Sequence, residues 1–216
     1  PAYRADRRRG SPDACGHELL MEVGLFFGSF NPIHTGHLII AQHLLNRAPI
    51  QQVWLVVSPH NPLKDKTSLA NDYDRLHLAQ LAVEEDPHIK VSNIEFSLPK
   101  PSYTIDTLTY LKEKYPHYQF SLIMGGDNLV SLPKWKNHEL ILRDYRIYVY
   151  RRPGAEEDQA DYLKHPHVTI TEAPLLDLSS TYIRNLIREG KSVRYMVPEK
   201  VYSELELSGL YKSSKT

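Results

Sequence analysis

The sequence predicts an α/β protein with a Rossmann-like, doubly wound, mostly parallel sheet that carries helices on both faces. Short apolar runs such as VGLFFG (23–28) and VWLVVS (53–58) have the composition of buried strands. The first of them is followed by HLIIAQHLLN (37–46), in which apolar residues recur at helical spacing. Strands that alternate with helices of this length form βαβ units, and their right-handed crossovers build a parallel sheet.

The same alternation of strand and helix patterns continues along the rest of the chain. Four further strands are expected at HIKVSNIEF (88–96), YQFSLIMG (118–125), DYRIYVYRR (144–152) and HVTITEA (167–173). Four further helices are expected at YDRLHLAQLAVEED (73–86), SYTIDTLTYLKEKY (102–115), TYIRNLIREG (181–190) and PEKVYSELELSG (198–209). The stretch RRPGAEEDQA (151–160) is expected to be an acidic surface loop.

The first twenty residues differ from the remainder of the chain. PAYRADRRRGSPDACGHELL contains an Arg triplet and two prolines and has little apolar periodicity. Asp6, Asp13 and Glu18 argue against an organellar transit peptide, because such peptides avoid acidic residues. We therefore expect a single domain over residues 21–216, preceded by a disordered or non-native extension over residues 1–20, with a natural start at Met21.

Composition and charge count against several classes of function. The 216 residues carry a formal net charge of zero, so no overall field favours nucleic acid or an anionic membrane. No apolar run approaches the roughly 18 residues of a membrane span. The single cysteine, Cys15, can form neither an intrachain disulfide nor a cysteine zinc site. The sequence thus predicts a cytoplasmic protein that acts on small molecules, without nucleic-acid or membrane partners.

The stretch GSFNPIHTGH (28–37) lies where the first predicted strand ends. In a doubly wound sheet, ligands bind beyond the carboxyl ends of the strands. Gly28 permits a close approach of the backbone, and Thr35 is placed to cap a helix that starts near Gly36. His34 and His37 are three residues apart at the first turn of this helix, so both imidazoles can point to the same side. Two imidazole donors at the positive end of a helix predict a triphosphate site.

The histidine pair has two other interpretations. One histidine could cap the strand–helix turn while the other packs in the core, and for either residue alone this is the favoured reading. A metal site is disfavoured because no carboxylate or cysteine accompanies the two histidines. The pattern is also not the GxGxxG dinucleotide fingerprint, because the second glycine is missing.

The stretch GSFNPIHTGH resembles the first signature of the nucleotidyltransferase superfamily, and SSTYIR (179–184) resembles its second signature. Within that superfamily, SPHNPLK (58–64), SYTIDTL (102–108) and GGDNLVSLPKWK (125–136) resemble the bacterial nicotinate-mononucleotide adenylyltransferases. The resemblance implies transfer of AMP from ATP to nicotinate mononucleotide, giving deamido-NAD and pyrophosphate in NAD biosynthesis. It also implies Mg²⁺, held mostly by ATP oxygens and water, with no dedicated protein ligands for a metal.

The resemblance also implies roles for particular residues. Catalytic roles fall to His34, His37, Lys64 and Arg184. ATP contacts fall to Gly28, Ser29, Phe30, His34, Gly36, His37, Gly125, Asp127, Ser179, Ser180, Thr181 and Arg184. Mononucleotide contacts fall to Ser29, Phe30, Lys64, Tyr103, Thr104, Trp135 and Lys136.

Several of these residues have a structural alternative. Asp127 could hydrogen-bond a ribose diol or cap a helix before NLVSL, and Trp135 could stack on the nicotinate ring or anchor a loop. Thr104 could grip a carboxylate at a helix start or simply cap that helix. The hydroxyls of residues 179–181 could bind phosphate or act as helix caps.

The sequence also departs from the family pattern at two loops. Asn31 stands where bacterial relatives often carry Asp, and PHNPLK replaces the more usual PPHK. The second departure leaves open whether His60 or Lys64 reaches the phosphates. For Asp74 and Arg75, an intrahelical or helix-cap charge role is preferred to support of a phosphate loop.

Other functions remain as alternatives. The acceptor could be nicotinamide mononucleotide or phosphopantetheine, although phosphopantetheine enzymes lack the SYTxxTL and DNLxxLPKW segments. A non-catalytic nucleotide-binding module and a nucleic-acid-binding Rossmann domain are the non-enzymatic alternatives, and the neutral charge counts against the latter. A homo-oligomer is compatible with the sequence.

Overall fold

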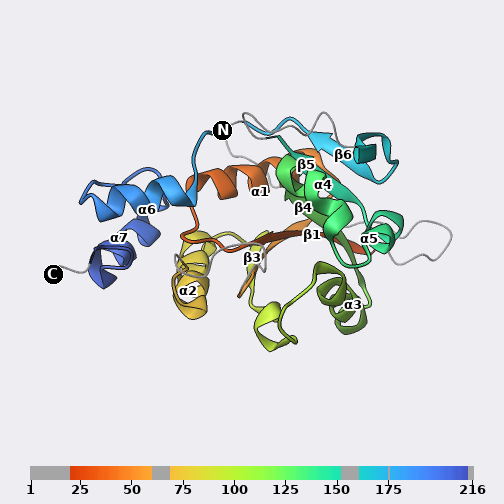
Figure 1. Cartoon of the computed structure of the whole chain (residues 1–216), viewed down its shortest axis with the longest axis horizontal. Helices are drawn as coiled ribbons and strands as arrows, with labels where there is room; N and C mark the ends of the chain where they lie inside the picture. The colour runs from red at the N-terminus through yellow and green to blue at the C-terminus, as the bar shows by residue number, and fades with distance from the viewer. Residues whose placement is uncertain (1–19, 60–68, 152–160, 175, 214–216) are drawn as a thin grey trace, which may run out of the picture.

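The computed structural model describes residues 20–59, 69–151, 161–174 and 176–213 (Figure 1). Its centre is a six-stranded sheet with the order β3-β2-β1-β4-β5-β6, in which every neighbouring pair is parallel. This is the strand order of a doubly wound Rossmann fold, which confirms the predicted fold class. The strands are β1 (Met21–Gly28), β2 (Gln52–Val57), β3 (Ile89–Ser92), β4 (Tyr118–Gly125), β5 (Ile147–Tyr150) and β6 (Val168–Thr171).

Helices cover both faces of the sheet. Val53, Leu55 and Val57 of β2 pack in one cluster, whereas Trp54 and Val56 pack in the other, as the alternation of a strand requires. The first cluster includes residues of α1 (Thr35–Arg47), α2 (Asp72–Val83), α6 (Ser180–Arg188) and α7 (Glu199–Ser208). The second includes residues of α3 (Thr104–Lys114), α4 (Gly126–Ser131) and α5 (His138–Asp144). Strands buried on both faces explain why their sequences read as continuous apolar runs.

The predicted strands and helices are all present, but the strand expected over 144–152 is confined to β5 (Ile147–Tyr150), and two other regions differ from the prediction. The expected strand over 88–96 ends at Ser92, and a 3-10 helix, η2 (Ile94–Ser97), follows Asn93. The short helices α4 and α5, of 6 and 7 residues, follow β4 in a region for which only a capped NLVSL segment was considered. A turn of 3-10 helix, η3 (Leu132–Lys134), lies between them. The expected loop over 151–160 lies outside the described residues from 152 onward.

The remaining described elements are η5 (Asp161–Lys164), which precedes β6, and the C-terminal pair α6 and α7, which Figure 1 shows at one end of the molecule. Within the described ranges, no helix is long and apolar enough to cross a membrane. The strand order reverses between β1 and β4, so their carboxyl ends form the crevice in which such sheets bind ligands.

Candidate active site

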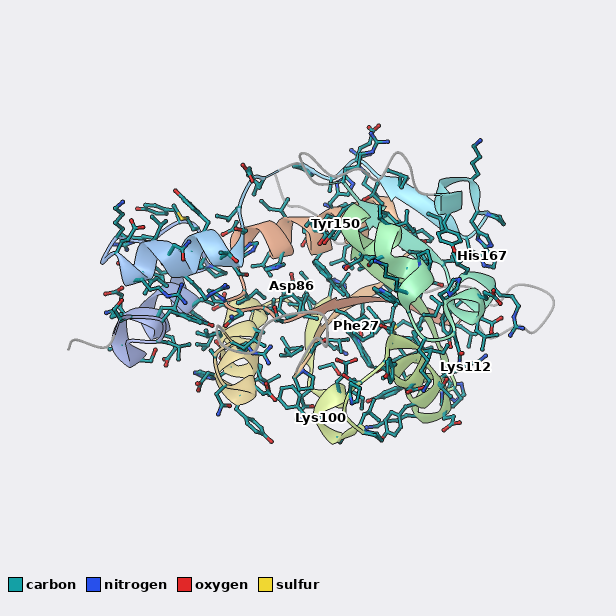
Figure 2. The ribbon with its side chains drawn as sticks, in the orientation of Figure 1. Phe27, Asp86, Lys100, Lys112, Tyr150 and His167 are labelled. Carbon is teal, nitrogen blue, oxygen red and sulfur yellow. The ribbon has the colours of Figure 1, made fainter. Side chains whose placement is uncertain are left out.

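A cavity of about 1000 Å³ opens at the carboxyl ends of β1, β4 and β5. Phe27 of β1 and Tyr150 of β5, both labelled in Figure 2, contribute to its wall. The predicted site residues that line it are Gly28, Ser29, Phe30, His34, Gly36, His37, Tyr103, Thr104, Asp127, Trp135, Lys136, Ser179, Ser180, Thr181 and Arg184. Gly125 is buried and does not line the cavity, and Lys64 and His60 fall outside the described residues. The structure thus brings residues from both ends of the chain to one cavity.

The two predicted histidines form a stacked pair at the start of α1. Their ring centroids are 3.7 Å apart with an interplanar angle of 27°. The backbone N–H of His34 donates to Nδ1 of His37 at 3.2 Å. Because Nδ1 accepts this bond, a neutral His37 carries its proton on Nε2, which becomes a donor for an anion.

The N-cap of α1 is His34, and not Thr35 as expected. The hydroxyl of Thr35 instead donates to the carbonyl of Met196 at 2.9 Å. Thr35 therefore ties the start of α1 to the C-terminal segment, while the two histidines complete a capping box at the helix end.

The turn between β1 and α1 depends on Gly28 and Phe30. A Cβ on Gly28 would lie 2.9 Å from the ring of Phe30, so only glycine fits there. The ring of Phe30 is 1% exposed and meets His37 edge-on, with 5.0 Å between the ring centroids. The buried ring of Phe30 therefore supports His37 from below the cavity surface.

Arg184 enters the cavity from α6 as a buried cation. It is 8% exposed, and its two terminal nitrogens donate to the carbonyl of Asn31 at 2.8 Å and to Oγ1 of Thr181 at 3.2 Å. Burial lowers the pKa of the Arg184 guanidinium below its usual value. Within the described ranges its hydrogen-bond acceptors are neutral and no salt bridge reaches it. A buried cation with neutral partners is stabilised by an added anion such as phosphate.

The hydroxyl-rich start of α6 is bound within the protein. Ser179 is the N-cap and accepts from the backbone N–H of Tyr182 at 3.2 Å, as the structural alternative expected. Ser180 donates to the carbonyl of Pro32 at 2.9 Å. These bonds fix the helix N-terminus against the 28–37 loop. Backbone N–H groups, Arg184 and the hydroxyls of Ser179 and Thr181, which only accept in these bonds, are the donors that can meet an anion.

Arg75 supports the phosphate side of the cavity, although sequence reasoning preferred a purely intrahelical role. It is fully buried and does pair with Asp72 within α2, at 2.6 Å. It also donates to the carbonyl of Ser29, to those of Ser58 and Pro59 at 3.0 and 3.3 Å, and to that of Ala70 at 3.2 Å. One guanidinium thus holds together the segments that follow β1 and β2. The DR pair at the start of a predicted helix was the only sequence signal.

Asn31 is a second supporting residue whose role the sequence left open. It is 3% exposed, and its Oδ1 accepts from the backbone N–H of Ala70 at 3.1 Å and from the hydroxyl of Tyr211 at 2.7 Å. Burial raises the pKa of Tyr211, which remains a neutral donor at neutral pH. Together with the Arg184 bond to its carbonyl, Asn31 joins both ends of the chain.

Asp127 lies in the first turn of α4, and Gly125 is the N-cap, so Asp127 is not the helix cap that was considered. A Cβ on Gly125 would lie 2.5 Å from Oδ1 of Asp127. Glycine therefore allows the Asp127 carboxylate to fold back over the end of β4, where it lines the cavity.

The opposite wall consists of Tyr103, Thr104, Trp135 and Lys136. Tyr103 and Thr104 both lie at the start of α3, as predicted, but the N-cap is Tyr103 and Thr104 is the first helical residue, so the alternative in which Thr104 caps the helix is wrong. Trp135 is half-buried against the second core cluster and also lines the cavity, so both interpretations of its ring fit the structure. Nζ of Lys136 contacts Asp106 at 2.8 Å and lies 4.9 Å from the centre of the Tyr103 ring.

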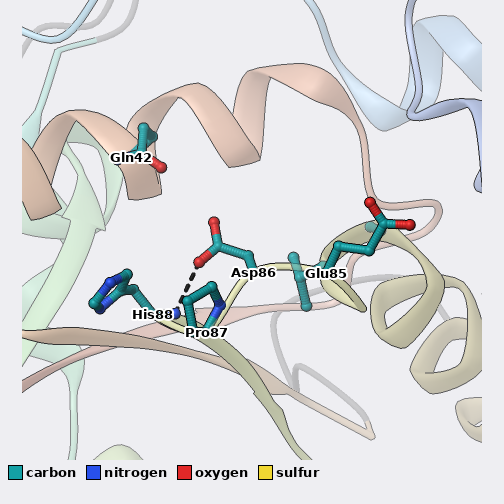
Figure 3. A pocket seen from close by; sticks show the side chains of 7 residues that line it. Gln42, Glu85, Asp86, Pro87 and His88 are labelled. Carbon is teal, nitrogen blue, oxygen red and sulfur yellow. Dashed lines mark hydrogen bonds between the residues drawn. The ribbon is translucent and has the colours of Figure 1, made fainter. Parts of the chain in front are cut away.

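A second pocket, of about 430 Å³, lies at the amino end of β3 (Figure 3). It includes Asp86 and His88, and the Asp86 carboxylate accepts from the backbone N–H groups of His88 at 2.8 Å and Ile89 at 3.2 Å. These bonds shape the turn into β3. The pocket is open and lies at the opposite end of the strands from the large cavity.

Comparisons with known proteins show which family the chain belongs to. The family model described as cytidylyltransferase-like matches residues 25–186. Proteins described as probable nicotinate-nucleotide adenylyltransferases from Flavobacterium johnsoniae and Cytophaga hutchinsonii are each 50% identical to this chain. Their alignments cover 89% and 90% of the chain and 100% of each relative. The chain therefore belongs to the cytidylyltransferase-like family and, within it, to the nicotinate-nucleotide adenylyltransferases.

Solved structures support the fold. A Plasmodium falciparum nicotinic acid mononucleotide adenylyltransferase in complex with NaAD has a TM-score of 0.75 at 19% identity. The match covers 88% of this chain and 97% of that one. A second structure of the Plasmodium falciparum enzyme, complexed with APC, has a TM-score of 0.74 at the same identity.

Proposed function

We propose that this protein transfers AMP from ATP to nicotinate mononucleotide, giving deamido-NAD and pyrophosphate in NAD biosynthesis. The observation that carries the proposal is one cavity with two differently built walls. One wall presents the stacked histidine pair and the buried Arg184. The other presents the N-terminus of α3 beside a half-buried indole. The first suits a triphosphate and the second an aromatic acid.

The reaction is an in-line displacement at the α-phosphorus of ATP. An oxygen of the mononucleotide 5′-phosphate forms a bond to the α-phosphorus, and the bond from that phosphorus to the bridging oxygen breaks. Pyrophosphate leaves with the electron pair of the broken bond. Because the attacking phosphate is already ionised near neutral pH, no general base is required, and catalysis consists of positioning and charge stabilisation.

The phosphate wall supplies the charge stabilisation. Nε2–H of His37 donates to an α-phosphoryl oxygen, with His34 beside it, because Nδ1 of His37 is occupied by the His34 backbone N–H. Arg184 and the N-terminus of α6 bind the departing pyrophosphate. Lys64 is proposed to add a further positive charge. Asp127 accepts from the hydroxyls of a ribose.

The opposite wall selects the acceptor. The backbone N–H groups at the start of α3, which Tyr103 and Thr104 introduce, bind the carboxylate of nicotinate, and the indole of Trp135 stacks on the pyridine ring. A neutral amide would gain less at a helix N-terminus than a carboxylate does. This geometry favours the acid mononucleotide.

Magnesium is proposed to enter as the ATP complex and to neutralise phosphate charge when bound. The described residues contain no group of three or more His, Cys, Asp or Glu that could hold a metal ion. The donors around the phosphate wall are imidazole and guanidinium, which fit phosphate oxygens and not a hard cation.

Pyrophosphate release from ATP in the presence of magnesium tests the proposal. Nicotinate mononucleotide, nicotinamide mononucleotide and phosphopantetheine are compared as acceptors at equal concentration. Release with the acid mononucleotide and much less with its amide is expected. Equal use of acid and amide would contradict the carboxylate argument, and ATP binding without release would support a non-catalytic nucleotide-binding module.

A further inference from the structure

Glu95 is a buried acid in the wall of the cavity. Three described acids line the cavity, and Asp127 and Asp177 are exposed, whereas Glu95 is only 3% exposed. It lies in η2, between β3 and α3. A carboxyl group taken out of water in this way requires hydrogen-bond donors around it.

Hydroxyl groups from both sides of the cavity wall supply those donors. Oγ1 of Thr107, a fully buried residue of α3, donates to Oε1 of Glu95 at 2.9 Å. Burial raises the pKa of Glu95, and hydrogen bonds from the side chains of Ser58, Thr107 and Ser102 act in the opposite direction. Ser102 directly precedes the N-cap of α3, and Ser58 directly follows β2. The Glu95 carboxyl group is therefore joined to the first turn of α3 through Thr107, and the side chains of Ser58 and Ser102 also influence it.

The connection fixes the part of α3 that faces the cavity. The carbonyl of Tyr103 accepts from the backbone N–H groups of Asp106 and Thr107 at 3.0 and 3.1 Å, and Oγ1 of Thr107 lies 3.4 Å from it. Glu95 thus holds Thr107, whose backbone N–H and hydroxyl meet the carbonyl of Tyr103. The backbone N–H of Ser58 in turn donates to the carbonyl of Gly28 at 2.9 Å, which extends the link to β1.

We propose that Glu95 is a positioning residue for the acceptor, which sets the place of the α3 N-terminus and thereby the affinity for the mononucleotide. Glu95 does this from within the wall, through its hydrogen bond with Thr107. The inference rests on the proposed function, because it assigns the α3 end to the acceptor. Displacements of about an ångström or less change how well a wall fits its ligand. Loss of the Glu95 hydrogen bond should therefore weaken binding of the mononucleotide and leave ATP binding unchanged.

Glu22 provides a matched control within the same chain. It is also a buried glutamate, at 6% exposed, and burial raises its pKa too. It lies at the amino end of β1, however, and does not line the cavity. A general cost of altering a buried acid would appear in both residues, whereas a positioning role would appear only in Glu95.

Steady-state kinetics of Glu95→Gln and Glu22→Gln test the proposal, with ATP and nicotinate mononucleotide varied in turn. Glutamine keeps the shape of Glu95, but its NH₂ group cannot accept a hydrogen bond. We expect the KM for the mononucleotide to rise about tenfold in Glu95→Gln, and the KM for ATP to stay within about twofold. Glu22→Gln should change neither constant. Equal changes in both KM values of Glu95→Gln, or none, would overturn the proposal.

Thr107 gives an independent variant in case Glu95→Gln does not fold. Thr107→Val removes the donor and keeps the side-chain shape, so the mononucleotide KM should rise by about three- to tenfold, and Thr107→Ser should restore most of the wild-type value. Failure of serine to rescue would contradict the proposal. Wild-type turnover is measured first: its absence would overturn the proposed function, whereas normal turnover with unchanged variants would overturn only the role of Glu95.

Discussion

The two walls of the cavity are held by buried groups of different kinds, guanidinium cations on one wall and a carboxyl group on the other. On the phosphate wall, the buried cations Arg75 and Arg184 donate to main-chain carbonyls of the loops after β1 and β2. On the acceptor wall, the buried acid Glu95 accepts a hydrogen bond from the hydroxyl of Thr107. Ser58 is linked to both walls, because its carbonyl accepts from Arg75 and its side chain acts to lower the pKa of Glu95.

The two walls therefore differ in rigidity. Carbonyl oxygens bound by a guanidinium define backbone positions, so the phosphate wall accepts little change in its framework. The acceptor wall ends in exposed groups, with Tyr103 38% exposed and an ion pair between Lys136 and Asp106 beside it. We therefore expect substitutions in the phosphate wall to affect the rate and the fold, and substitutions in the acceptor wall to affect acceptor affinity.

The largest effect is expected at His37. His37→Ala removes a donor to the α-phosphoryl group, so kcat should fall by about 10²–10³ while the mononucleotide KM stays within about twofold. His43→Ala, on the same helix α1 but outside the cavity wall, is the control and should retain the wild-type rate. A His37→Ala enzyme with near-normal kcat would break the assignment of catalysis to the phosphate wall.

Arg75 should show the framework role most directly. Arg75→Met leaves several buried acceptors without a donor, so the free energy of unfolding should fall by about 3 kcal/mol in urea denaturation. Arg75→Lys should not restore it, because an ammonium group lacks the planar fork. Arg188→Met removes an exposed arginine of α6 and is the control. A loss below about 1 kcal/mol for Arg75→Met would show that the two walls do not differ in rigidity.

A smaller effect on acceptor choice is expected at Lys136. Lys136→Met leaves Asp106 without its ion-pair partner near the α3 N-terminus, so the preference for acid over amide mononucleotide should fall about two- to fivefold. The double variant Lys136→Met/Asp106→Asn should recover part of the preference for the acid. High salt should reduce the difference in this preference between wild type and Lys136→Met. Lys112→Met, at the other end of α3, controls for the loss of charge. An unchanged acid-to-amide ratio would count against electrostatic tuning of this wall.

The smallest effect concerns Glu22, a buried acid outside both walls. Because burial raises its pKa, the folded state binds a proton more tightly than the unfolded state does. Its stabilising contribution is complete below the ordinary glutamate pKa of about 4.3 and is lost as pH rises through the folded-state pKa. Glu22→Gln should therefore melt about 2 °C above wild type at pH 7 and at the same temperature near pH 4. A variant less stable at pH 7 would reverse this sign.

The sequence predicted the parts of the molecule that local patterns define. Continuous apolar runs placed the strands, and residues 118–125 match β4 fully. The three-residue spacing of His34 and His37 predicted a shared orientation, which the stacked rings confirm. The helices α4 and α5 were not fully predicted because 6 and 7 residues are too few to establish helical periodicity.

The supporting residues could not be predicted, because their partners come from distant segments. Arg75 binds Ser29, 46 positions away, and Glu95 is bound by the hydroxyl of Thr107, 12 positions away. Nothing local distinguishes these residues from the charged residues of an ordinary amphipathic helix or turn. The wrong expectation of a strand through residue 96 also concealed Glu95, because an acid in an edge strand reads as exposed.

The hydrogen bond from Tyr211 to Asn31 spans 180 positions of the chain and has a consequence for synthesis. During synthesis, β1 and its histidine loop leave the ribosome before residue 211, which braces this loop, has been made. The nascent protein therefore carries the sequence of the loop long before the loop gains its full support. The phosphate site is complete only after residue 211 has been made and has reached back to Asn31.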